Sequence, residues 1–292
     1  MEGLKGATVL VTGAGGFLGK HVMRALQEAG ALPIAVSRQL GLDLTLVDRA
    51  LSMLLVTRAP LVIHLAAPSI ETTPATQIRD TLQMGMNVMT ACSSAGAKLV
   101  FVSRSSTPSE RAVQQALLEN ARAHQKACGL TFAQVLPGDL YGPLDRMEGT
   151  SLPVVPYLLT EIQQRADQRQ KLVTLKGNPK TKFEPLHVSD AAAAIVRATD
   201  LPGCAEPLYL EGTQSIPIEE MAETVAGVCK FKGEIEWESE EARWTPNTGQ
   251  EGALAREVLD WKPAVTFQAG IEETHLWRFG APKAEPAPKG KK

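Results

Sequence analysis

Three glycines spaced three residues apart form the first pattern in this sequence that could do chemistry. Gly13, Gly16 and Gly19 stand in the stretch VTGAGGFLG, between a β-branched run and a helix pattern that begins at Phe17 and Leu18. Glycine lets the backbone turn tightly and approach a pyrophosphate, whose charge is met by free N–H groups at the helix start. The spacing therefore predicts a dinucleotide site to which these five residues contribute.

Two further stretches belong to the same predicted site. The second strand pattern ends in VSRQ, where NAD sites usually offer a carboxylate to the ribose hydroxyls. Ser37 and Arg38 stand there instead, and a guanidinium suits the 2′-phosphate of NADP. We expect NADP(H), with NAD(H) as the alternative. Ala66 and Ala67 follow the third strand pattern and leave room for a bound nucleotide.

The elements that must position these residues alternate between strand and helix. Strand patterns cover residues 7–13, 32–38, 61–67 and 98–103, a fifth begins at Phe132, and helix patterns lie between them. This alternation predicts an α/β fold, a Rossmann-type doubly wound parallel sheet with helices on both faces. A small C-terminal α+β substrate-type lobe is expected beside it.

The alternation breaks after FAQVLPGDLYGP, which suggests the domain boundaries. We expect an NADP-binding Rossmann domain over residues 1–142 plus 184–210, and the substrate-type lobe over 143–183 plus 211–280. Residues 281–292, rich in Lys and Pro, have nothing to bury and predict an extended tail.

Composition narrows the classes of function. The 292 residues carry a net charge of -2, which gives no support for nucleic-acid binding. No apolar run reaches the roughly 18 residues that a transmembrane helix needs. No histidine pair has zinc-ligand spacing, so no metal is expected. Cys92, Cys128, Cys204 and Cys229 stand far apart in apolar surroundings, which predicts buried thiols in an intracellular, reducing compartment, either the cytoplasm or an organelle matrix.

These motifs together resemble the extended short-chain dehydrogenase/reductase family, in its NAD-dependent epimerase/dehydratase branch, and within it the GDP-L-fucose synthases. The matching stretches are VTGAGGFLG, LDLT before VIHLAA, NV at Asn87, CGLTFAQVLPGDLYGP, LKGNP, FKGEIEW and VLDWKP. The resemblance implies NADP binding and adds Asp43, Leu44 and Asn87 to the cofactor site. The Asp43 carboxylate in LDLT has two alternative roles, a contact to the adenine or a cap of the next helix. It also implies protein partners, in a homodimer or a larger complex.

The same resemblance implies a catalytic Ser/Thr, Tyr and Lys, with the lysine four residues after the tyrosine. The three tyrosines are followed at that spacing by Asp145, Glu161 and Thr213, so the chain has no Tyr-x-x-x-Lys. The tyrosine position falls at Glu110 or Arg111 and the lysine position at Gln114 or Gln115. Other family positions align with residues that lack the required chemistry: Arg104 for the hydroxyl, Ser105 for the epimerase cysteine and Thr150 for the acidic histidine.

The chain has the cofactor motif of the family it resembles but lacks the catalytic residues of that family. Three hypotheses follow. The first is a catalytically degenerate NADP-binding protein that serves as a structural or accessory subunit of a larger assembly. The second is an active NADPH-dependent nucleotide-sugar epimerase/reductase with a relocated proton donor, for example Tyr141, or Ser103 or Ser106 with a lysine. The third is a sensor whose affinity for a partner depends on the redox state of the bound cofactor.

Overall fold

A six-stranded parallel sheet forms the centre of the larger part of the molecule. The computed structural model describes residues 2–38, 41–68, 72–104, 106–149, 151–238, 241, 243–246 and 252–280. The strand order is β10-β5-β4-β3-β1-β2, and all neighbours are parallel. The strands are β1 (Thr8–Thr12), β2 (Leu32–Val36), β3 (Leu61–His64), β4 (Lys98–Val102), β5 (Phe132–Pro137) and β10 (Cys204–Leu210).

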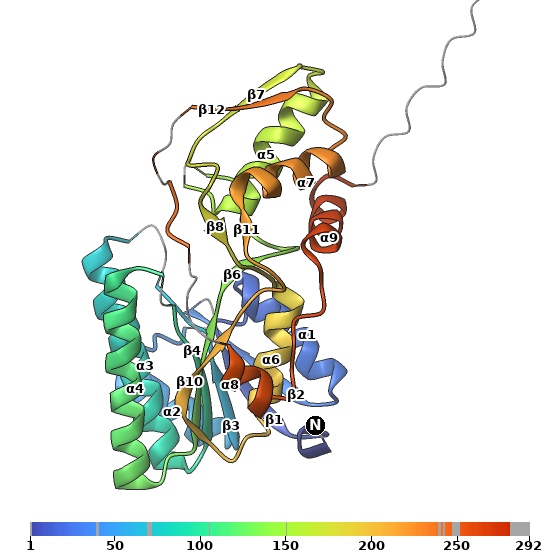
Figure 1. Ribbon diagram of the computed structural model, residues 1–292. Coiled ribbons are helices and arrows are strands. Elements are labelled where there is room, and N and C mark those ends of the chain that lie inside the picture. The colour runs from blue at the N-terminus through green and yellow to red at the C-terminus, as the bar shows by residue number, and fades with distance from the viewer. Residues whose placement is uncertain are drawn as a thin grey trace, which may run out of the picture. The chain divides into compact units, whose positions relative to one another are not determined.

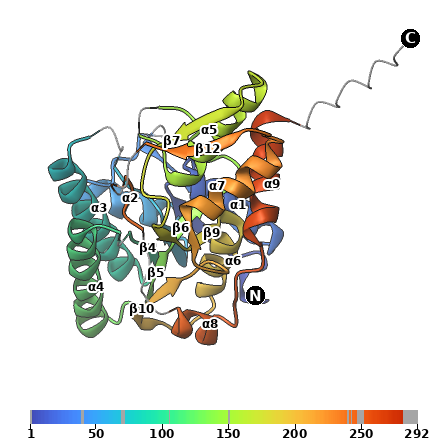
Figure 2. The ribbon, with the colours of Figure 1, turned by 45° about the horizontal axis from the view of Figure 1, so that its top comes forward.

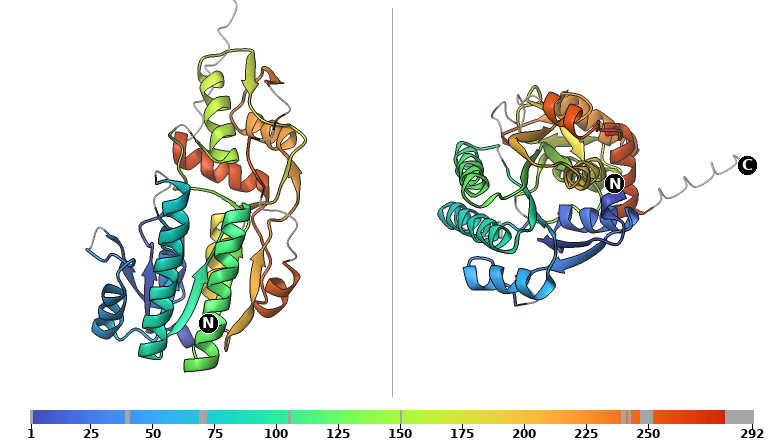
Figure 3. Two further views of the ribbon diagram at one scale, coloured as in Figure 1. Left: turned by 90° about the vertical axis from the view of Figure 1, so that its left-hand side faces the viewer. Right: turned by 90° about the horizontal axis from the view of Figure 1, so that it is seen from below.

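Helices cover both faces of this sheet. On one face α1 packs against α6, and on the other α2 packs against α3 and α3 against α4, as Figures 1 and 3 show. The bounds are α1 (Phe17–Glu28), α2 (Val47–Thr57), α3 (Pro74–Ala95), α4 (Pro108–Cys128) and α6 (Val188–Ala198). The predicted Rossmann-type doubly wound sheet is confirmed. Among the helices that the structure describes, none combines the length and apolar character needed to cross a membrane.

Strand β1 shows why the apolar runs in the sequence are continuous. Val9 and Val11 face the core that Val22 and Leu26 of α1 also enter. Leu10 points to the opposite face and joins the core under α2 and α3. Because both faces of a doubly wound sheet are covered, the consecutive residues Val9, Leu10 and Val11 are all apolar, rather than every second residue.

The chain divides into two compact units. Unit 1 contains Met1–Leu140, Lys182–Ser215 and Thr245–Val265, and unit 2 contains Tyr141–Thr181, Ile216–Trp244 and Thr266–Lys292. The middle segment of unit 1 adds β9 (Pro185–His187), which pairs with β6 (Asp139–Tyr141), and β8 (Lys182–Phe183).

Unit 2 is a small lobe of helices and short strands (Figure 2). Strands β7 (Leu172–Leu175) and β12 (Glu234–Trp237) form a two-stranded parallel sheet. Helix α7 (Ile218–Val228) packs against α5 (Val154–Asp167) and α9 (Phe267–Phe279), and β11 (Ile216–Pro217) leads into α7. The expected tail over residues 281–292 lies outside the described residues.

The longest stretch that lies in a different unit from the one expected is Thr245–Val265, and the other boundaries differ at residues 141–142, 182–183 and 211–215. Thr245–Val265, which includes α8 (Ala253–Val258), belongs to unit 1, although the sequence placed it in the second lobe. The Asp190 carboxylate accepts hydrogen bonds from the backbone N–H groups of Ala264 and Val265, both at 2.9 Å. The Trp261 indole N–H donates to the Asp190 carbonyl, and the indole enters the core beneath α6.

The cysteines only partly match the expected buried thiols. Cys92 and Cys229 are buried, and Cys204 is half-buried. Cys128, the last residue of α4, is exposed.

Candidate functional site

The glycine-rich turn after β1 is shaped by two close backbone approaches. Gly13 has a φ of 70°, and a Cβ there would lie 2.7 Å from the Ala66 backbone nitrogen. A Cβ at Gly19 would overlap the Gly13 carbonyl oxygen. Only glycine meets both demands, so the turn can bring the start of α1 against the end of β1.

The middle of the same turn is open. Nothing lies within 4 Å of a Cβ built on Gly15, so a ligand can approach the backbone there. Gly16 is the N-cap of α1, no side chain caps that end, and the first turn holds no acidic residue. The free N–H groups and the helix dipole therefore favour an anion at this position.

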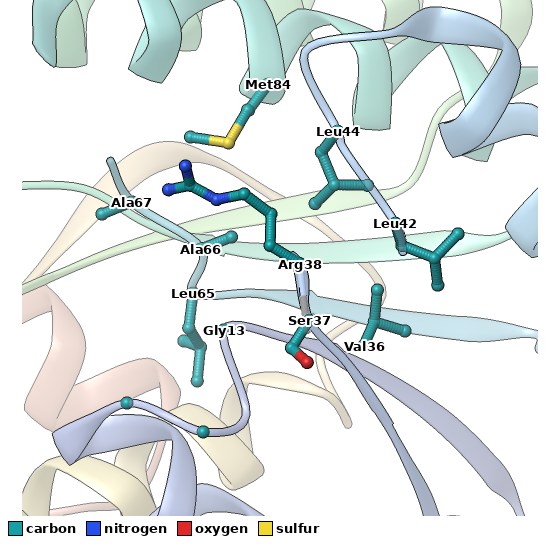
Figure 4. A pocket seen from close by; sticks show the side chains of 12 residues that line it. Gly13, Val36, Ser37, Arg38, Leu42, Leu44, Leu65, Ala66, Ala67 and Met84 are labelled. Carbon is teal, nitrogen blue, oxygen red and sulfur yellow. The ribbon is translucent and has the colours of Figure 1, made fainter. Parts of the chain in front are cut away.

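A cavity of about 390 Å³ lies beside this turn, a size typical of a ligand pocket. It lies next to the ends of β1, β2 and β3, where the strand order reverses and doubly wound folds bind their ligands. Figure 4 shows its walls. The lining residues are Gly13, Gly15, Gly16, Val36, Ser37, Arg38, Leu42, Leu44, Leu65, Ala66, Ala67 and Met84.

Arg38 brings positive charge to a cavity whose other lining side chains are mostly apolar. It follows β2, is exposed, and extends across the cavity toward Met84 and Ala67 (Figure 4). Ser37 lines the cavity beside it. The end of β2 offers a guanidinium rather than a carboxylate, which suits a phosphate.

Five predicted cofactor residues do not line the cavity, and three of them have clear structural roles. Gly19 allows the close packing of α1 described above. Asp43 accepts hydrogen bonds from the Thr45 backbone N–H and hydroxyl, which hold the pKa of its carboxyl below the ordinary value. Asn87 donates from Nδ2 to the Leu44 carbonyl at 2.9 Å and so ties α3 to the cavity wall. Phe17 and Leu18 begin α1 and contribute their position at the helix N-terminus.

Five residues that line the cavity were not expected from the sequence. Gly15 lies inside the glycine motif, so its position could have been found from the motif. Met84 stands about one helical turn before Asn87, on the same side of α3, which was also a usable signal. Val36, Leu42 and Leu65 flank predicted residues, but nothing in their type distinguishes them from core residues.

His64 has a structural role at the ends of β1 and β3. Its Nδ1 lies 2.7 Å from the Thr12 hydroxyl oxygen, and that oxygen accepts a hydrogen bond from the Ala66 backbone N–H. Burial lowers the pKa of His64 to about 4, so the imidazole is neutral near pH 7. This chain of contacts joins the ends of β1 and β3 under the cavity.

The resemblance places catalysis in the segment between β4 and α4. The described residues there make contacts that stabilise the start of the helix. Thr107 and Glu110 form a reciprocal capping box at the start of α4. Glu110 also pairs with Arg104, at 3.0 Å between Oε1 and Nε. The Glu110 carboxylate is therefore occupied by a helix end and an arginine. Ser105 and Thr150 lie outside the described residues.

The expected lysine position is also occupied by a structural side chain. Gln114 is buried and donates from Nε2 to Oε1 of Gln134 at 3.3 Å. Gln134 in turn donates to the Ser103 hydroxyl and to the Gln114 carbonyl. These neutral amides join α4 to β5, and none of the three side chains carries a charge that would lower the pKa of a neighbouring hydroxyl.

Two of the relocated donors considered from the sequence are held by other contacts. Tyr141 is 1% exposed, and its hydroxyl lies against Gly270 and donates to the Thr266 carbonyl at 3.5 Å. The Ser103 hydroxyl is buried in the amide network. Ser106 is half-buried. Among the described residues no group of three His, Cys, Asp or Glu side chains is placed to hold a metal ion.

Comparison with known proteins confirms the resemblance stated from the motifs. Residues 9–115 match the NAD dependent epimerase/dehydratase family. The chain is 27% identical to the probable GDP-L-fucose synthase 1 of Oryza sativa subsp. japonica, over 94% of this chain and 92% of the relative. It is 26% identical to GDP-L-fucose synthase 1 of Arabidopsis thaliana, over 94% and 93% respectively.

Solved structures show the same fold. A GDP-L-fucose synthetase from Naegleria fowleri superposes with a TM-score of 0.81 at 20% identity, covering 94% of this chain and 92% of that one. The same enzyme bound to NADP gives 0.79 at 19% identity, covering 93% and 92%.

Proposed function

We propose that this protein binds NADP(H) in the cavity of unit 1 and is a nucleotide-sugar epimerase/reductase in type. The observation that carries the proposal is the cavity itself, which combines an open glycine turn, an uncapped helix start and an arginine after β2. The residues fit the cofactor, because a Cβ at Gly13 would collide with the backbone while Gly15 leaves open space.

Each part of the cavity has a proposed task. The N–H groups at the start of α1 would hold the pyrophosphate, and Arg38 would pair with the 2′-phosphate that distinguishes NADP from NAD. Leu42, Leu44 and Met84 would form the apolar slot for the adenine. Asn87 would hold that slot in place through its bond to Leu44. When bound, NADPH supplies a hydride.

The first candidate for the reaction is reduction of a nucleotide-linked keto-sugar. It is supported by the similarity, over more than nine-tenths of this chain, to proteins named GDP-L-fucose synthases. A proton donor other than a tyrosine paired with a lysine would then be required, because the sequence has no Tyr-x-x-x-Lys. Unit 2 would bind the sugar nucleotide.

The second candidate is a non-catalytic subunit that keeps the cofactor for structure. The specific observation that favours it is the segment between β4 and α4. Arg104 and Glu110 pair with each other there, and Gln114 is buried in a neutral network. A positioned acid or base typically contributes about 10²–10⁴-fold to a rate, so loss of two such groups leaves little turnover.

One assay separates the candidates. The purified protein is mixed with NADPH and a GDP-linked 4-keto sugar, and NADPH binding and NADPH consumption are followed separately. Binding with consumption that depends on the sugar supports the reductase. Binding without consumption supports the non-catalytic subunit. Absence of NADPH binding overturns the proposal as a whole.

A further inference from the structure

Unit 2 holds an exposed arginine stacked on two aromatic rings. The guanidinium carbon of Arg243 lies 4.4 Å from the centre of the Tyr157 ring and 5.0 Å from that of Trp244. The two rings are 5.2 Å apart and tilted by 54° to each other. Tyr157 comes from α5, so the stack joins a helix to the segment that follows β12.

A hydrogen bond fixes each of the two rings beneath the guanidinium. The Tyr157 hydroxyl accepts a hydrogen bond from the Lys176 backbone N–H at 2.9 Å, and Tyr157 is 6% exposed. The Trp244 indole N–H donates to the Leu152 carbonyl, also at 2.9 Å. Gly177 has a φ of 110°, and a Cβ there would lie 3.0 Å from Trp244 and 3.5 Å from the Arg243 side chain. The platform is therefore preorganised.

The charge of Arg243 has no carboxylate partner within the described part of the chain. Other arginines of unit 2 do have one: Arg278 pairs with Glu148 and Arg165 with Glu161. Stacking occupies the flat faces of a guanidinium and leaves its N–H edge free to donate. Lys176, which precedes Gly177, adds a second cation and pairs with Glu238 at 3.5 Å.

We propose that Arg243 on the Tyr157–Trp244 platform binds the phosphate of a nucleoside diphosphate. A guanidinium edge donates two parallel hydrogen bonds to a phosphate, and a side chain already held by stacking loses little conformational freedom on binding. The assignment rests on the proposed function, because a nucleotide-linked sugar carries a diphosphate. It names a group in unit 2 that would hold such a ligand, separate from the NADP(H) cavity of unit 1.

The Trp244 indole N–H provides a local readout by NMR. Its ¹⁵N–¹H signal is assigned with Trp244→Phe and then followed while pyrophosphate, GDP or guanosine is added to the full-length protein. Because the indole belongs to the platform, its signal reports on the surroundings of Arg243. We expect GDP and pyrophosphate to shift the signal and guanosine, which has no phosphate, to leave it in place.

Substitutions of the arginine complete the test. Arg243→Gln should weaken GDP binding about 10-fold or more, the effect of losing a charged hydrogen-bond donor. Arg243→Lys keeps the charge but loses the two-pronged geometry, so an intermediate loss is expected. Arg169→Gln, at an exposed arginine of the same unit that is not stacked, is the matched control and should change nothing.

Three results would overturn this assignment: no shift with GDP or pyrophosphate, an equal shift with guanosine, or unchanged GDP binding in Arg243→Gln. NADPH binding is measured on the same samples. If NADPH binds while GDP does not, the assignment to Arg243 fails and the proposed cofactor site stands. If neither binds, the proposed function fails as well.

Discussion

At the scale of single residues, we expect Arg38 to determine the choice of cofactor. It is an exposed arginine whose side chain extends across the cavity, next to the end of β2. A 2′-phosphate beside it would be held by charge-assisted hydrogen bonds, while NAD offers only a hydroxyl there. We therefore expect the preference for NADP to depend on this one side chain.

Replacing Arg38 by Gln should reduce the affinity for NADPH about 10- to 100-fold and change the affinity for NADH little, because a hydrogen bond to a charged group contributes about 1.5–3 kcal/mol. Fluorescence titration with the two cofactors measures this. Arg24→Gln is the control, at an exposed arginine that bonds to Glu28 along α1. An equal loss for both cofactors would show that Arg38 does not discriminate between them.

Two glycines of the same turn should respond differently to added side chains. Gly15→Val places a side chain in open space, so we expect normal stability and a large loss of NADPH affinity. Gly19→Ala forces a Cβ into the Gly13 carbonyl, so we expect about 1–3 kcal/mol of destabilisation, as for overpacking. Thermal unfolding and NADPH titration of both variants measure this. NADPH bound normally by Gly15→Val would place the cofactor elsewhere.

Asp145 should make the stability of unit 2 depend on pH. Burial raises the pKa of its carboxyl from 3.8 to about 7, and its Oδ2 has no hydrogen-bond partner within the described structure. Because the folded pKa lies above the unfolded one, the folded state loses stability as the pH rises from about 4 to 7. Asp145→Asn does not ionise, so its stability advantage should grow over that interval and then level off.

Urea unfolding of the wild type and Asp145→Asn at pH 4, 5.5, 7 and 8.5 measures this difference. The difference in unfolding free energy should reach at least about 1 kcal/mol at pH 8.5, the lower end of the cost of an unsatisfied buried polar group. A difference that stays constant with pH would mean that Asp145 ionises in the folded protein as it does in the unfolded chain.

At the scale of elements, α4 begins with the residues that replace the expected catalytic set. Thr107 accepts from the Glu110 backbone N–H at 3.1 Å, and the Glu110 carboxylate accepts from the Thr107 N–H at 3.0 Å. Pro108 at the first helical position suits the same helix start. These residues stabilise the start of the helix, and the Glu110 side chain is engaged there in the capping box and in its ion pair with Arg104.

Removing the cap should therefore cost stability and not cofactor binding. We expect Thr107→Ala to lower the free energy of unfolding by about 0.5–2 kcal/mol with unchanged NADPH affinity. Glu110→Gln preserves the capping box, because glutamine also accepts from the N-cap backbone, and should cost less. Chemical denaturation and NADPH titration measure both effects. If Glu110→Gln instead abolished turnover that the wild type performs, Glu110 would be an acid–base group.

The elements also show how far the sequence predicts the structure. The motifs of the glycine turn and of the α4 cap each lie within a few consecutive residues, so local sequence patterns were sufficient to predict both. Asn87 was expected to contact the cofactor, but its amide donates to the Leu44 carbonyl, and only the packing of α3 against the segment between β2 and α2 reveals this. The place of Thr245–Val265 depends on Asp190, more than 70 residues earlier in the chain, which no local pattern reports.

At the scale of the whole molecule, two units carry separate parts of the proposed function. Unit 1 has the cavity for NADP(H), and unit 2 has the stacked Arg243 for a phosphate-bearing ligand. The resemblance places the residues that transfer protons after β4 and at the start of α4. The structure shows the Arg104–Glu110 ion pair and the Gln114–Gln134 amide pair at these positions. The structure therefore supports cofactor binding more directly than it supports catalytic turnover.

The most direct test of that claim is to identify the nucleotide that the protein carries. The protein is purified under native conditions and denatured, and the released nucleotide is identified and quantified by mass spectrometry beside an Arg38→Gln sample. We expect NADP(H) in near one-to-one amount from the wild type and much less from the variant. A wild-type protein that releases NAD(H), or that neither carries nor takes up any nicotinamide nucleotide, would contradict it.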